Sequence, residues 1–71
     1  MKYQLITDIA SGNTQTQVKE FANGYGCHAT LITKSGPGGG NPVYKFASSK
    51  FSYLEELAGQ LNIPETDIET I

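Results

Sequence analysis

The sequence predicts a small α+β domain with the ferredoxin-like, split βαβ arrangement. Strand and helix periodicities follow one another in the order strand, helix, strand, strand, helix and a short final strand. A glycine-rich segment joins the second strand directly to the third, which is typical of an antiparallel hairpin. Sequential pairing and right-handed crossovers then place two helices on one face of an antiparallel sheet. With 71 residues, we expect a single domain over residues 1–71.

The first element is a strand over residues 2–8. Its side chains alternate, with Tyr3, Leu5 and Thr7 on one face. Serine, glycine and asparagine then interrupt the pattern over residues 10–13, which predicts a loop before the first helix.

The first helix has signals at both ends. Thr14 and Gln17 have the spacing of a capping box, in which each side chain bonds a free backbone N–H of the first turn. Apolar residues recur at intervals of three and four, which indicates one buried face. This stripe comprises Val18, Phe21, Ala22 and Tyr25. We expect Asn23 and Gly24 to end the helix, because glycine readily adopts the left-handed conformation.

The second and third strands cover residues 27–34 and 42–48. Alternation places Tyr44 and Phe46 on one face of the third strand. Four side chains of the second strand share a face in the same way, namely Cys27, Ala29, Leu31 and Thr33. Six of the eight residues in 35–42 are glycine or proline, so this connection is a turn or loop.

The second helix covers residues 53–61, and Ser52 and Glu55 have capping-box spacing at its start. Asn62 and Pro64 predict its end. Its buried stripe comprises Leu54, Leu57, Ala58 and Leu61.

The tail is predicted to form a short final strand over residues 67–71, with Ile68 and Ile71 on opposite faces. A last helical turn that begins at Pro64 is the alternative.

Composition argues against several classes of protein. Five lysines, no arginine and seven acidic residues leave a net charge of −2, whereas proteins that bind the phosphate backbone of a nucleic acid are normally basic. The longest apolar run is far too short to span a membrane, and we expect no signal peptide. The single cysteine forms no internal disulfide, which favours a reducing, cytoplasmic location.

The predicted topology brings several loops to one edge of the sheet. Residues 9–13, the start of the first helix, the glycine-rich segment and residues 62–64 meet there, whereas His28 lies at the opposite edge. Consecutive glycine N–H groups beside a helix N-terminus suit a small anionic ligand such as a phosphate or nucleotide. The candidate ligand-binding residues are Asp8, Asn13, Thr14, Lys34, Gly38, Gly39, Gly40 and Asn41.

Two other interpretations of the glycine-rich segment stay open. It is a hairpin tip without a ligand, or it inserts into a partner protein. The segment does not match the phosphate-binding loop or the dinucleotide motif, because both of those enter a helix and this segment enters a strand.

We expect no catalytic activity, no metal and no cofactor. Cys27 and His28 are adjacent on a strand and point to opposite faces, so they do not form a thiolate–imidazole pair. Because cysteine is among the most buried residue types, we expect Cys27 in the core or at its boundary. Asp8 has no second acid or base to act with. Aromatic residues on the first and third strands are similar to those of RNA-recognition sheets, but the third strand lacks the basic and glycine residues of that motif. We therefore assign these aromatics to the core.

Charge is unevenly distributed along the chain. Residues 1–51 carry a net charge of +3, and residues 52–71 carry −5. Glu55 and Glu56 fall in the first turn of the predicted second helix, where the helix dipole favours anions. The other acids of this segment are a candidate surface for a basic partner, with solvation of the chain end as the alternative. They are Glu65, Asp67 and Glu69.

The segment GPGGGNPVYKF, followed by YLEELAGQLNIPETDIE, resembles small accessory proteins of tailed bacteriophages. The resemblance covers residues 36–69 and carries over no catalytic residues. It implies an accessory protein that acts on a host or viral macromolecule in the host cytoplasm. The predicted topology is also similar to that of ACT-type regulatory domains, which bind small ligands at subunit interfaces.

These observations favour a non-catalytic interaction module. It would bind a protein partner or form a homodimer, through the glycine-rich segment or the open face of the sheet. A domain for a small molecule or nucleotide at the loop edge is the alternative. We expect neither nucleic acid nor membrane as a partner.

Overall fold

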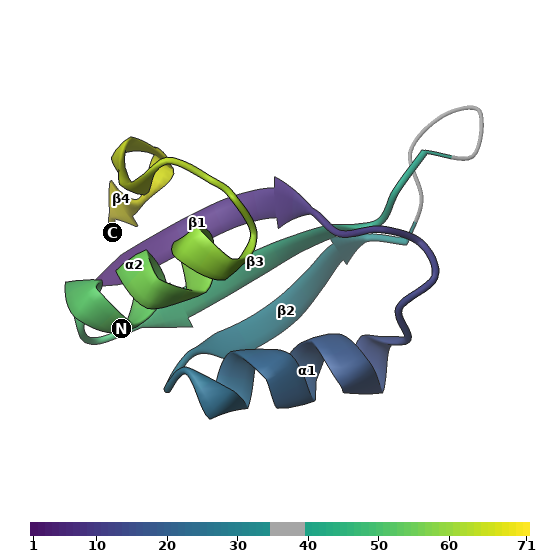
Figure 1. The fold of residues 1–71 in the computed structure, drawn as a ribbon, viewed down its shortest axis with the longest axis horizontal. Helices are drawn as coiled ribbons and strands as arrows, with labels where there is room; N and C mark the ends of the chain where they lie inside the picture. Colours follow the sequence, from purple (N-terminus) through teal and green to yellow (C-terminus); the bar gives the residue numbers. More distant parts are fainter. Residues whose placement is uncertain (35–39) are drawn as a thin grey trace.

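The computed structural model describes residues 1–34 and 40–71 and has the predicted ferredoxin-like arrangement (Figure 1). Four strands, two helices and one 3₁₀ turn follow the expected order. The strands are β1 (Tyr3–Asp8), β2 (His28–Thr33), β3 (Val43–Ser48) and β4 (Glu69–Thr70). The helices are α1 (Gln15–Gly24) and α2 (Phe51–Gln60), and the 3₁₀ turn is η1 (Glu65–Asp67).

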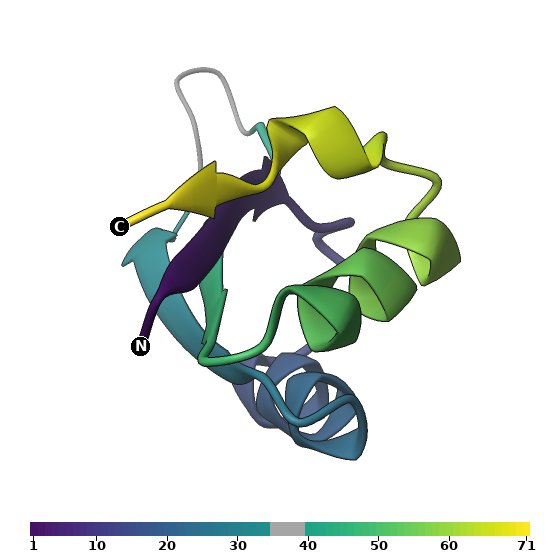
Figure 2. The ribbon, with the colours of Figure 1, turned by 90° about the vertical axis from the view of Figure 1, so that its left-hand side faces the viewer.

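The strands form one antiparallel sheet in the order β2-β3-β1-β4. As predicted, β3 lies between β1 and β2. Both helices lie on the same face of this sheet (Figure 2), with α1 against β2 and α2 against β1 and β3. We call the opposite face the outer face, and no element of the described residues covers it. Register places on it Gln4, Ile6, Asp8, His28, Thr30, Thr33, Val43, Lys45, Ala47 and Glu69. Ile32 has no partner in β3, and alternation from Thr30 places it on the same face.

The core lies between the sheet and the helices. Leu5 of β1 and Phe46 of β3 are opposite each other in the sheet, and both are fully buried. Leu54 and Leu57 of α2 belong to the same buried cluster, as does Ala22 of α1. Each large apolar side chain buried in this way contributes about 1.5–3 kcal/mol. The central pair of strands is therefore the platform on which the helices pack.

The start of α1 confirms the predicted capping box. The Thr14 N–H donates to Gln17 Oε1 at 2.9 Å, and the Gln17 N–H donates to Thr14 Oγ1 at 3.1 Å. The helix ends at Gly24, as predicted, but the left-handed residue is Gly26, with φ +70°, and not Gly24. The ring of Tyr25 packs on Phe21 of the last turns, at 5.3 Å between centroids, and this contact keeps the chain close to helical geometry beyond Gly24.

The predicted capping box of the second helix was also wrong. The helix begins at Phe51, so Ser52 lies inside it, and Lys50 is an N-cap without a side-chain bond. The ring of Phe51 packs edge-on against Tyr3 at 5.6 Å between centroids, which holds this residue against β1. Glu55 consequently lies beyond the first turn of α2.

One strand also departs from simple alternation. The pairing of β2 with β3 is irregular between Leu31 and Thr33, so that two residues of β2 occupy the space opposite Val43. Both Ile32 and Thr33 are exposed. The prediction that Thr33 shares the core face with Ala29 was therefore wrong, because a bulge shifts the phase of alternation by one residue.

Both alternatives predicted for the tail occur, one after the other. Asn62, with φ +58°, ends α2. Pro64 then precedes η1, and β4 follows as a two-residue strand beside β1. Ile68 packs against the core and Ile71 is exposed, as alternation predicted.

Ser48 joins three segments at the end of β3. This buried side chain donates a hydrogen bond to the Gly26 carbonyl at 3.2 Å and accepts one from the Lys50 N–H at 3.3 Å. The backbone carbonyl of Ser48 accepts a hydrogen bond from the Lys2 N–H at 3.2 Å. One residue thus holds together the turn after α1, the start of α2 and the beginning of β1.

We expect Ser48→Ala to lower the free energy of unfolding by about 1–3 kcal/mol, because two partners lose their hydrogen bond at a buried position. Urea denaturation followed by circular dichroism measures this. The neighbouring Ser49→Ala, at an exposed position, is the control and is expected to change stability little. Equal stability of the two variants would contradict the assigned role of Ser48.

Gly26 lies under the ring of Tyr53. A Cβ built at Gly26 would stand 2.6 Å from Tyr53 Cδ2, and the positive φ is itself unfavourable for a side chain. We expect Gly26→Ala to lower the free energy of unfolding by more than about 1 kcal/mol. Gly24→Ala, inside α1 with open space around it, is expected to raise it by about 0.5–1 kcal/mol. Thermal denaturation of both variants tests this, and a stabilised Gly26→Ala would refute it.

Candidate functional site

Asp8 and Asn41 meet at the edge of the sheet where β1 ends and β3 begins. Asn41 Nδ2 donates to Asp8 Oδ2 at 3.1 Å, and both residues are exposed. The Ile9 N–H donates to the Pro42 carbonyl at 3.0 Å and continues the pairing of the two segments. Because Asp8 alternates with Gln4 and Ile6, it belongs to the outer face.

The other two candidates before α1 lie on the helix-covered side of the sheet, and most of their polar atoms have partners within the chain. Asn13 Nδ2 and the Asn13 N–H both donate to the Ala10 carbonyl, at 3.1 and 3.2 Å. Thr14 forms the capping box with Gln17. Asp8 therefore belongs to a different face of the sheet from Asn13 and Thr14.

The glycine-rich part of the predicted anion site is described only at its ends. Lys34 and Gly40 are exposed. Gly38 and Gly39 lie outside the described residues, and the anion site they complete stays a prediction.

The three acidic residues predicted to meet a partner lie in different surroundings. Glu65 and Asp67 belong to η1, and Glu69 belongs to β4, where it is paired with Gln4. The Glu65 carboxyl lies beside Glu55 of α2. A hydrogen bond with Glu65 and repulsion between the two carboxylates raise the pKa of Glu55 above its ordinary value, with smaller contributions from desolvation and from Glu56.

Cys27 is a core residue, as predicted. Its Sγ donates to the Tyr25 carbonyl at 3.5 Å, and burial raises the pKa of the thiol, although a hydrogen bond with Ser48 partly offsets this. His28 is exposed on the opposite face. A buried thiol with a raised pKa has little thiolate at neutral pH and is a poor nucleophile.

The aromatics of β3 are core residues too. Tyr44 and Phe46 are 2 % and 0 % exposed and lie on the face that the helices cover. These rings are therefore inaccessible to a base that would stack on the sheet.

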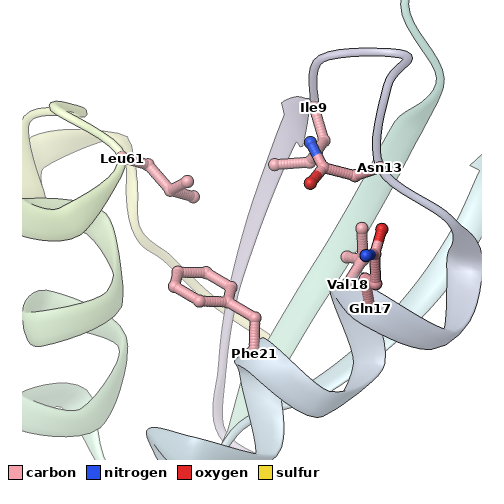
Figure 3. Close-up of a pocket in the computed structure, with 6 residues that line it drawn as sticks. All are labelled: Ile9, Asn13, Gln17, Val18, Phe21 and Leu61. Atoms are coloured by element: carbon pink, nitrogen blue, oxygen red, sulfur yellow. The ribbon is translucent and has the colours of Figure 1, made fainter.

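A cavity of about 230 Å³ opens between α1 and the end of α2 (Figure 3). It forms because α1 rests on β2 while α2 rests on β1 and β3, and the residues that follow β1 close one end. Six residues line it, and none of them is charged. They are Ile9, Asn13, Gln17, Val18, Phe21 and Leu61.

Five of these residues were not among the predicted site residues. The sequence pointed to this region only indirectly. The predicted topology brings residues 9–13, the start of the first helix and residues 62–64 together at one edge of the sheet. The cavity confirms that convergence for Ile9, Asn13 and Gln17, and Leu61, which also lines it, comes directly before the predicted residues 62–64. Its size depends on the spacing of the helices, which no local pattern encodes.

Comparisons of the chain with models of protein families, with curated proteins and with solved structures find no match. Within residues 1–34 and 40–71, neither helix has the length and apolar character needed to cross a lipid bilayer. Function is therefore inferred from the outer face, the loop edge and the cavity.

The raised pKa of Glu55 has a consequence for stability. The folded chain retains a proton on Glu55 at pH values where the unfolded chain has lost it, so this group makes folding less favourable as pH rises from its ordinary pKa of 4.5 through the raised value. We expect Glu55→Gln to raise the melting temperature at pH 7, with the gain disappearing below pH 4.5.

Calorimetry over a pH series, at low salt because exposed charges are screened, measures this gain. Glu20→Gln on α1 is the matched control and is expected to show no such pH-dependent gain. A melting temperature of Glu55→Gln that does not differ from wild type at pH 7 would contradict the assignment.

Proposed function

We propose that this chain is a non-catalytic module that binds a protein partner through the outer face of its sheet. The observation that carries the proposal is the exposure of apolar side chains on that face. Ile6 of β1 is 45 % exposed and Ile32 of β2 is 51 % exposed, one on each side of β3. Both helices lie on the other face (Figure 2).

The apolar area of the outer face extends beyond these two residues. Val43 of β3 is half-buried there. Ile71 is 66 % exposed, and its N–H donates to the Lys2 carbonyl at 2.8 Å, which continues the pairing of β4 with β1. Alternation from Glu69 places Ile71 on the outer face as well. Three exposed isoleucines on one uncovered face favour its use as a binding face.

The positive charge of Lys45 near the centre of this face favours a partner that carries a carboxylate. Lys45 lies opposite both Ile6 and Thr30 in the neighbouring strands and is half-buried. A partner surface with an apolar centre and a carboxylate for Lys45 would bury the isoleucines and pair this charge. Asp8 and Glu69 lie toward the ends of the same face. A two-fold axis that passes close to Lys45 would bring the Lys45 ammonium groups of two copies together, which favours a different protein over a homodimer.

The resemblance to accessory proteins of tailed bacteriophages supports a partner in the cytoplasm of a bacterial host. The proposed module would act by occupying a surface of a host or viral protein. It needs no catalytic residue for this role, since binding alone alters the partner.

We expect Ile6→Asp and Ile32→Asp to weaken partner binding by about ten- to a hundredfold, since truncating a central apolar contact typically costs about 1–3 kcal/mol. The tagged full chain is used to capture proteins from cells that produce it, and quantitative mass spectrometry compares the variants. Circular dichroism verifies that the variants are folded.

Thr16→Asp is the matched control, because it introduces the same charge at an exposed position of α1 on the opposite face. The proposal requires a protein retained by wild type and by Thr16→Asp but lost from the two isoleucine variants. A set of captured proteins that is the same for all four chains would refute it.

A further inference from the structure

The cavity between α1 and α2 has an apolar interior. Val18 is buried, and Ile9, Phe21 and Leu61 are half-buried around it. In Figure 3, Leu61 and Phe21 face each other across the space, below Ile9. An apolar cavity of about 150 Å³ accommodates benzene. A volume of about 230 Å³ therefore has room for a six-membered ring together with a small polar group.

Two carboxamides line the same cavity, and each has one atom engaged within the chain. Gln17 Oε1 accepts from the Thr14 N–H, and Asn13 Nδ2 donates to the Ala10 carbonyl. In the described residues, Gln17 Nε2 and Asn13 Oδ1 have no protein partner. The site thus offers one amide donor and one amide acceptor, each with its orientation fixed by the bond that the other end of the same group makes.

We propose that this cavity binds a small uncharged molecule with a ring-sized apolar body and a carboxamide head. The carbonyl of the head would accept from Gln17 Nε2, and its N–H would donate to Asn13 Oδ1. A charged head is disfavoured, because no charged side chain lines the cavity to pair with it. The site lies on the helix-covered side of the sheet and is independent of the outer face.

The variant Gln17→Glu tests ligand binding without disturbing the capping box of α1. Glutamate at this position keeps an oxygen for the Thr14 N–H, since glutamate is a usual residue of the capping box, and its charge is favourable near a helix N-terminus. The substitution removes the donor that the ligand needs and adds one negative charge. Gln15→Glu makes the same chemical change in the same turn of α1, at an exposed residue that does not line the cavity.

The test is a titration of the full chain with benzamide, followed by amide resonances in two-dimensional NMR. We expect saturable shifts at the lining residues, with a dissociation constant in the millimolar range suited to a ligand of this size. Gln17→Glu should weaken benzamide about tenfold, the effect of one hydrogen bond. The same variant should prefer the cation benzamidine to benzamide, whereas Gln15→Glu should behave as wild type.

Three results would overturn the proposal. The first is the absence of saturable shifts at the lining residues with benzamide. The second is equal binding of toluene at the same resonances, which would mean that the cavity takes apolar molecules without recognising the head. The third is an equal loss of benzamide affinity in Gln15→Glu and Gln17→Glu. The added negative charge, and not the lost donor, would then explain the weaker binding.

Discussion

The pairing of β1 with β3 around Leu5 and Phe46 is the contact on which the rest of the structure depends. These two fully buried side chains lie opposite each other on adjacent strands and form the surface on which α2 packs. β3 also carries β2, on which α1 rests. Because both crossovers are right-handed, the two helices lie on one face of the sheet, and the outer face is left uncovered.

The two ends of the sheet differ in how tightly they are held. At the end of β3, Ser48 bonds the turn after α1 and the start of α2, and Gly26 lies under Tyr53. At the other end, the residues that follow β1 turn back into α1 beside the cavity, and the Asp8 carboxylate accepts a hydrogen bond from Asn41. The side-chain bonds of Ser48 thus lie at one end of the molecule, and the cavity lies toward the other.

The two proposed binding surfaces follow from this arrangement. A small domain has only one core, so each sheet face is either covered by helices or left for another molecule. The outer face leaves Ile6 and Ile32 exposed beside Lys45. On the covered face, α1 and α2 rest on different strands, and the space between them is filled only in part. The outer face suits a protein, and the cavity between α1 and α2 suits a molecule no larger than a substituted ring.

The amino-acid sequence by itself determined the order of the elements, the buried face of each and the capping box at Thr14, because these depend on local hydrogen bonding and on the periods of helix and strand. Only the tertiary structure decided the start of α2 at Phe51, the left-handed turn at Gly26 and the bulge before Thr33. Each of these depends on a neighbour distant in the chain or beyond the predicted element boundary. The cavity belongs to the same class, since its volume is set by how far apart two helices rest on a shared sheet.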